Sequence, residues 1–167
     1  MNEELKSKFS NIFIMLLFSV MTNDLEKVKH FLSNEMYFRY NDIINKNNSN
    51  NEIEMFDELN VKDINIVRSF EDEVNEYKEV NITSRYIHYF IDKETKRYKS
   101  GNNSNRIEKT NKLIFKKKKQ AEERKNVIKC EHCGANLDIN FTGACEYCGI
   151  VTDVSPYDYI LIDLITY

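Results

Sequence analysis

The sequence predicts an α+β fold in which helices come first, an antiparallel sheet follows, and a small four-cysteine ribbon ends the chain. Apolar residues recur at helical spacing up to residue 44 and then alternate with a period of two from Val61. All four cysteines lie between residues 130 and 148. The chain has 167 residues, 41% of them apolar, so it can bury a core; its net charge of −3 argues against a protein that coats nucleic acid.

The most apolar stretch, residues 11–21, predicts a buried helix. A membrane span needs about 20 apolar residues, and this run ends at the polar residues 22–24. A secretory signal needs a positively charged start and a small-residue cleavage site, whereas acidic and basic residues balance in residues 1–8. We therefore expect a core helix and a cytoplasmic protein.

Two further helices are predicted from capping residues. Asn23, followed by Glu26, resembles an N-cap with its capping-box partner and predicts a short second helix. Ser33 is placed to cap a third helix. The polar residues 45–51 predict a mobile loop, and residues 52–59 a last helical turn.

The sheet is predicted from residue 61 onward. Residues 61–70 and 77–92 alternate as strands, residues 93–105 carry turn chemistry for a hairpin arm, and residues 106–115 form the next strand. One face of the second strand contains Val80, Ile82, Ser84, Tyr86, His88 and Phe90. This face is predicted to point into the core.

A charged segment, residues 116–126, is predicted to link this domain to the ribbon. It has no large apolar side chain and begins with the basic run Lys116, Lys117, Lys118 and Lys119. Such runs are usually solvated, and these four lysines are also candidates for weak contact with anionic lipid.

The four cysteines predict a metal site. Cys130 and Cys133 form one C-x-x-C pair, Cys145 and Cys148 form a second, and glycine follows each pair directly. In a metal knuckle the backbone turns tightly around the thiolates, and glycine takes the required positive φ without steric cost. Four thiolates on two knuckles suit one structural Zn²⁺ ion.

The alternatives explain the spacing less well. Disulfides are disfavoured in a cytosolic compartment. A redox dithiol needs one C-x-x-C at a helix start, not two matched knuckles. A rubredoxin-like iron site has the same ligands and stays open, although rubredoxins separate their pairs by a longer stretch. His132 is not needed as a ligand, because four thiolates fill the site.

The ribbon does not have the charge of a nucleic-acid-binding module. There is no lysine or arginine between Cys130 and Asp153, and contact with phosphates needs cationic side chains. We therefore expect the ribbon to brace the fold or to meet a protein partner.

The C-terminal residues 156–167 are too apolar for an exposed end. We expect them to be buried as an added strand or helix on the main domain, or in a homodimer contact.

Several segments resemble the bacterial Tim44-like proteins that end in a zinc ribbon. They are the helical start at 8–44, the strand segments VKDINIV and VNITSRYIHYFIDKETKRYKSG, the ribbon CEHCGANLDINFTGACEYCGIV and the tail SPYDYILIDLI. The ribbon is the most specific of them. The family commonly has one tryptophan on the last domain strand and another in the tail, and this chain has none.

The resemblance implies an NTF2-like fold, in which a curved antiparallel sheet wraps around helices to form a cone. It also implies a protein- or lipid-interaction module with a role in protein transport or at a membrane surface. Many members carry a membrane-spanning segment upstream; here we expect at most peripheral contact. The expected organisation is a Tim44-like domain at 1–115, a linker at 116–126, a zinc ribbon at 127–153 and a packed tail at 154–167.

A cone can also hold a small ligand or a catalytic site of the isomerase or dehydratase kind. Such a site needs a carboxylate or histidine base inside the cone, and His88 is the candidate on the inward strand face. We expect no enzyme activity, because an inward histidine is more often a core residue. A cavity open to solvent, with an acid beside His88, would favour the alternative.

Overall fold

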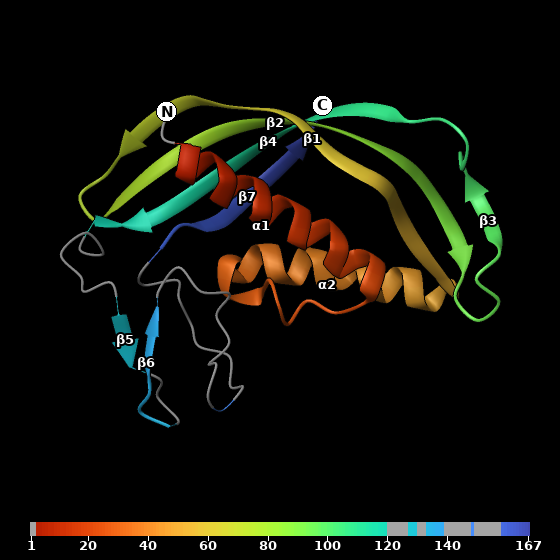
Figure 1. The fold of residues 1–167 in the computed structure, drawn as a ribbon, viewed down its shortest axis with the longest axis horizontal. Coiled ribbons are helices and arrows are strands. Elements are labelled where there is room, and N and C mark those ends of the chain that lie inside the picture. The colour runs from red at the N-terminus through yellow and green to blue at the C-terminus, as the bar shows by residue number, and fades with distance from the viewer. Residues whose placement is uncertain (1–2, 120–126, 130–132, 139–147, 149–157) are drawn as a thin grey trace.

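The computed structural model of the chain describes residues 3–119, 127–129, 133–138, 148 and 158–167. Two α-helices come first, and a curved antiparallel sheet arches over them (Figure 1). This order confirms the predicted α+β class and is consistent with an NTF2-like arrangement.

The first helix, α1 (Glu3–Thr22), is followed by a short 3-10 helix, η1 (Lys29–Phe31), and not by the second α-helix that we expected. Asn23 has a φ of +57° and ends α1 instead of starting a helix, so its predicted role as an N-cap is wrong. The carboxylate of Asp24 accepts a hydrogen bond from the Glu26 amide instead and makes a local turn.

The second α-helix, α2 (Asn34–Ser49), begins as predicted, because the Ser33 hydroxyl accepts a hydrogen bond from the Met36 amide. The predicted loop at 45–51 is wrong, since α2 continues to Ser49. Asn47 in this stretch is buried and donates a side-chain hydrogen bond, so its polarity is used inside the protein and does not mark a loop.

The two longest strands, β1 (Glu52–Glu71) and β2 (Asn75–Asp92), pair antiparallel along nearly their whole length. The predicted helical turn at 52–59 is wrong, because these residues are the first part of β1. The register shifts three times along β1, and Glu58 in the first irregularity has a φ of +53°. Bulges of this kind bend a strand, which lets the sheet curve around the helices.

The sheet is completed by β3 (Tyr98–Gly101), β4 (Ile107–Lys118) and β7 (Ile160–Thr166). Its order is β1-β2-β4-β7, with β3 paired to the far end of β2. Lys116, Lys117 and Lys118 lie in β4, so the start of the predicted linker is wrong by three residues. The described part of the tail is a strand and not a helix. A separate hairpin contains β5 (Val127–Lys129) and β6 (Asn136–Asp138).

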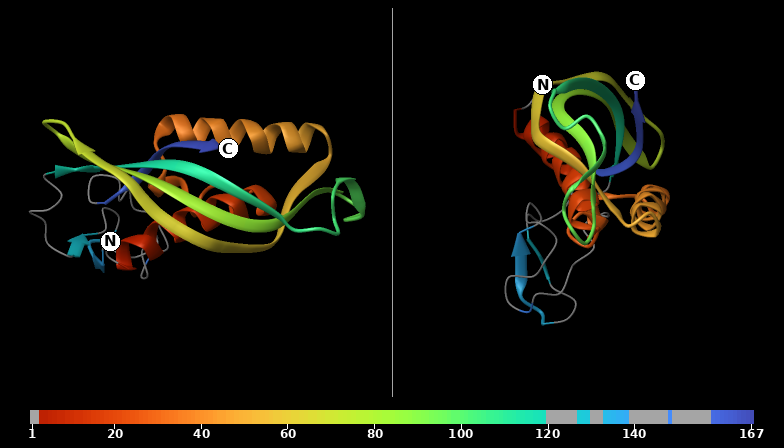
Figure 2. Two further views of the ribbon diagram at one scale, coloured as in Figure 1. Left: turned by 90° about the horizontal axis from the view of Figure 1, so that it is seen from above. Right: turned by 90° about the vertical axis from the view of Figure 1, so that its right-hand side faces the viewer.

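Helix α1 packs into the concave side of the sheet, where Phe9, Phe13 and Leu16 are almost completely buried. Figure 2 shows α1 beneath the long strands and α2 beside β7. By length and composition alone, α1 could also cross a membrane, a property shared by core helices and signal sequences. Its burial agrees with the predicted core helix.

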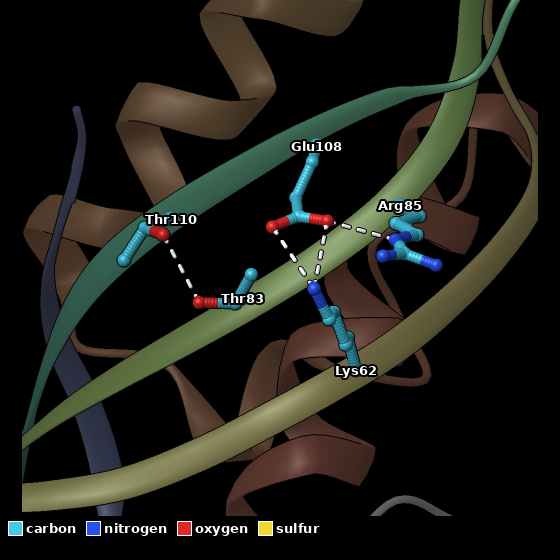
Figure 3. A network of polar contacts seen from close by, with 5 residues as sticks. All are labelled: Lys62, Thr83, Arg85, Glu108 and Thr110. Carbon is cyan, nitrogen blue, oxygen red and sulfur yellow. Dashed lines mark hydrogen bonds and ion pairs between the residues drawn. The ribbon is translucent and has the colours of Figure 1, made fainter.

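A network of polar side chains lies on the outer face of the sheet, as Figure 3 shows. Arg85 on β2 and Lys62 on β1 both bind the carboxylate of Glu108 on β4, at 2.8 and 3.2 Å. Next to them the hydroxyls of Thr83 and Thr110 lie 3.0 Å apart. The sheet therefore has an apolar inner face and a polar outer one, as the alternation in the sequence predicts.

Candidate ligand-binding cavity

A cavity of about 300 Å³ lies between the two helices and the inner face of the sheet. The position is a consequence of the fold, because a curved sheet leaves space where its strands diverge from the helices. Every long element of the main domain contributes to the wall. The cone is therefore not completely filled by its aromatic side chains.

The wall is apolar on most of its area and polar at a few points. The apolar residues that line it are Phe13, Leu17, Val20, Ile43, Phe56, Ile107 and Leu164. The polar ones are Tyr40, Glu54, Tyr86, His88, Lys109, Asn111 and Thr166. An apolar concavity with a few convergent polar groups is the usual form of a small-molecule site.

The central polar feature of the cavity is a pair formed by Glu54 and His88. The Nε2 atom of His88 lies 2.8 Å from Oε1 of Glu54, and the other carboxylate oxygen accepts a hydrogen bond from Asn47 at 3.3 Å. The imidazole also stacks on the ring of Phe56, with ring centroids 5.1 Å apart. Both side chains are therefore held in one orientation.

The tautomer of His88 follows from this geometry. A carboxylate can only accept, so Nε2 of His88 carries the hydrogen and donates it to Glu54. In the neutral imidazole Nδ1 is then a hydrogen-bond acceptor. No group among the described residues hydrogen-bonds this nitrogen, so it can accept a further hydrogen bond.

Two phenols add neutral hydroxyl groups. Burial is the main cause that raises the pKa of Tyr40 to about 12; the charge of Arg39 opposes it, and the weaker effect of Glu54 adds to it. Burial and then Glu54 also raise the pKa of Tyr86. Both side chains therefore stay protonated at ordinary pH and can donate or accept one hydrogen bond.

The sequence profile of the Tim44-like domain matches residues 1–126 of the chain. The match covers the helices and strands β1 to β4, which build most of the cavity wall. The chain belongs to the Tim44-like domain family. A search of curated proteins finds none that matches it.

The match to the Tim44-like domain ends before the first cysteine and before β7. Strand β7 nevertheless pairs with β4 from Asn111 to Lys116 and contributes Leu164 and Thr166 to the cavity. The folded unit therefore extends beyond the residues that the family profile covers.

In this Tim44-like domain the inward position predicted for His88 is confirmed, whereas its acidic partner was missed. Glu54 was assigned to a helical turn, so nothing in the sequence analysis placed it near His88. The alternation of residues 54 and 56 was the signal that could have placed Glu54, because residues two apart on a strand share a face. Phe56 lies directly opposite His88 in the register of β1 and β2, so Glu54 lies on the same face as His88.

Only half of the predicted metal site can be located. Cys133 and Cys148 lie in described residues, while Cys130 and Cys145 lie outside them. Within the described ranges, no group of three or more histidine, cysteine or acidic side chains is placed to hold a metal ion. Gly134, directly after Cys133, has a φ of +75°, which is the conformation expected of a knuckle glycine.

The basic run is divided between different environments. Lys119 forms an ion pair with Glu71 at 3.4 Å, and the ammonium of Lys117 lies 5.5 Å from the centre of the Tyr159 ring. Lys116 is half-buried and Lys118 is exposed. The four lysines therefore do not form one uniform basic patch.

Proposed function

We propose that this Tim44-like protein is a non-enzymatic binding module whose cavity holds the apolar part of a small amphipathic ligand. The observation that carries the proposal is the cavity of about 300 Å³, with its mainly apolar wall and few polar groups. This volume is at the lower end of the usual range for small-molecule sites, roughly 300–1,000 Å³. Burial of an apolar chain there is favoured by about 25 cal/mol for each Å² removed from water.

The experiment fills the cavity from one side. Ile43 on α2 lines it and is half-buried, so Ile43→Trp should occupy part of its volume. Phe38 on the same helix is 62% exposed, and Phe38→Trp is the matched control. We expect 1-decanol to bind the unaltered protein and Phe38→Trp equally, and to bind Ile43→Trp at least about tenfold more weakly. Equal binding by all three would overturn the proposal.

We also propose that Cys130, Cys133, Cys145 and Cys148 hold one structural Zn²⁺ ion. Two matched C-x-x-C-G knuckles support this assignment, and so does the positive φ of Gly134 in the connection between β5 and β6. Four thiolates leave no open coordination position, so the ion would stabilise the ribbon and not perform catalysis.

We also propose that the protein contacts a protein partner and, weakly, an anionic membrane surface. The acidic ribbon favours a protein partner over nucleic acid. Lys118 and its neighbours would give at most weak, salt-sensitive contact with anionic lipid, because Lys119 is already paired with Glu71. Both contacts are compatible with a cytoplasmic protein that works at or near a membrane surface and takes part in protein transport.

A second candidate function is favoured by the Glu54–His88 pair. An imidazole held by a carboxylate is the arrangement of a general base. His88 Nδ1 could take a proton from the carbon between a carbonyl group and a carbon–carbon double bond, leaving the electron pair on a dienolate oxygen, and return it to the far end of that double bond, which shifts into conjugation with the carbonyl. Deuterium exchange into a small cyclic ketone tests this. Exchange that is faster than in buffer and is lost in His88→Phe would favour this catalytic function. Exchange no faster than in buffer would exclude the catalytic function for small cyclic ketones.

A further inference from the structure

We propose that the cavity selects an apolar ligand with a neutral hydroxyl head over one with a carboxylate head. This inference rests on the proposed function, because it requires that an apolar chain enters the cavity at all. It adds the chemistry of the head group, which the volume and the apolar wall alone do not determine.

The charge of Glu54 disfavours a carboxylate head in the cavity. The Glu54 side chain is only 16% exposed and lines the wall, and its negative charge acts on the phenols of both Tyr40 and Tyr86. A ligand carboxylate at the same depth would lose its water and be repelled by Glu54. A hydroxyl has no charge to repel.

The hydrogen-bonding groups of the wall also favour a hydroxyl head. The phenols of Tyr40 and Tyr86 can donate, while Nδ1 of His88 can only accept. A ligand hydroxyl can accept from a phenol and donate to Nδ1 at once. A carboxylate has no hydrogen to donate, so it cannot satisfy Nδ1.

The cations near the cavity do not reverse this preference. Lys109 lines the wall, but it is exposed on β4 and its ammonium can stay in water. Arg39 is not among the lining residues, and its guanidinium binds the carboxylate of Asp163 and the carbonyl of Leu164. Of the two charged residues in the wall, the negative Glu54 is therefore the less exposed, and the positive Lys109 is open to solvent.

The test compares three probes of equal chain length on the full chain. We would titrate 1-decanol, decanoate and methyl decyl ether by calorimetry at pH 8. The ether matches the alcohol in chain length but cannot donate a hydrogen bond. We expect decanol to bind at least about tenfold more tightly than decanoate and several-fold more tightly than the ether.

Two variants assign the preference to its residues. Glu54→Gln should bring the affinity of decanoate close to that of decanol, while Glu58→Gln should leave the ratio unchanged. Glu58 is the matched control, because it lies on the same strand, is 56% exposed and pairs with Arg106. His88→Phe should lower the affinity for decanol to that for the ether, without changing the affinity for the ether.

The outcomes separate this inference from the proposed function. If no probe binds, the proposed function itself fails. If all three bind the unaltered protein equally, the cavity binds apolar chains without selecting the head group, and the inference is overturned. The inference would also be overturned if decanoate bound more tightly than decanol and Lys109→Gln abolished this difference. Lys109 would then determine which head group the cavity prefers. The comparison of probes needs no variant, so it holds even if Glu54→Gln does not fold.

Discussion

The ring of Phe9 on α1 stacks on the ring of Phe115 on β4, with centroids 4.0 Å apart and planes 16° from parallel. The ring of Tyr159, just before β7, makes a T-shaped contact with the ring of Phe9, with centroids 5.3 Å apart. All three side chains are buried. One aromatic cluster therefore joins the first helix to the C-terminal part of the sheet.

The cluster predicts a large loss of stability on truncation of Phe9. Phe9→Ala should lower the free energy of unfolding by about 3–5 kcal/mol, because it removes a fully buried ring and leaves a cavity. Phe18 on the same helix is 50% exposed, so Phe18→Ala should change the free energy of unfolding by less than about 0.5 kcal/mol. Urea denaturation measures both. Similar losses in the two variants would show that α1 does not pack as described.

Strand β7 offers a similar comparison. Leu161 is completely buried, whereas Ile165 on the same strand is 45% exposed. Leu161→Ala should cost about 2–5 kcal/mol and Ile165→Ala much less. Deletion of residues 156–167 should lower the melting temperature by several degrees, since it removes a strand from the sheet. A truncated protein that melts like the full chain would contradict the pairing of β7 with β4.

The parts of the fold that sequence reasoning predicted are those with local signals. The alternation of Val80, Ile82 and Tyr86 indicated the inner face of β2, and Ser33 indicated the start of α2. Besides the cap at Asn23 and the start of the linker at Lys116, the errors lie at residues 45–59, where Asn47 and Glu54 place polar side chains inside the protein. Asn47 binds Glu54, and Glu54 binds His88, so one of the polar side chains that suggested a loop holds a residue of the cavity wall in place.

The cavity itself could not be predicted from local pattern. Its shape depends on the bend of β1, which results from register shifts against β2 at Asp57 and beyond. The pairing of Glu54 with His88 joins residues 34 positions apart, and it requires the correct start of β1. The histidine alone was visible from alternation, because it lies in a regular strand.

The ribbon predicts a metal content that can be measured directly. Protein purified without added metal should contain about one equivalent of zinc, and Cys133→Ser should lose it and unfold the ribbon. The main domain should still unfold cooperatively, since its described core contains no cysteine. His132→Ala is the matched control within the same knuckle and should retain the metal. Less than half an equivalent of zinc, mainly iron, or loss of metal in the control would contradict the assignment.

The outer face of the sheet predicts a pH effect. The hydrogen bond from Arg85, and then that from Lys62, hold the pKa of Glu108 below its usual range. A carboxyl with a lower pKa in the folded state stabilises the protein fully above its unfolded pKa, about 4.3, and loses this contribution as the pH falls through the folded value. Glu108→Gln should therefore melt below the unaltered protein at neutral pH, and the difference should disappear in acid.

Two controls identify the cause of this effect. Glu73 is exposed and has no ion pair among the described residues, so Glu73→Gln removes the same charge without breaking a contact and should not change the melting temperature. Exposed ion pairs are screened by salt, so the effect of Glu108→Gln at neutral pH should shrink at high ionic strength. Thermal melts across pH and salt measure both. A difference that persists in acid would show that Glu108 acts through packing and not through its charge.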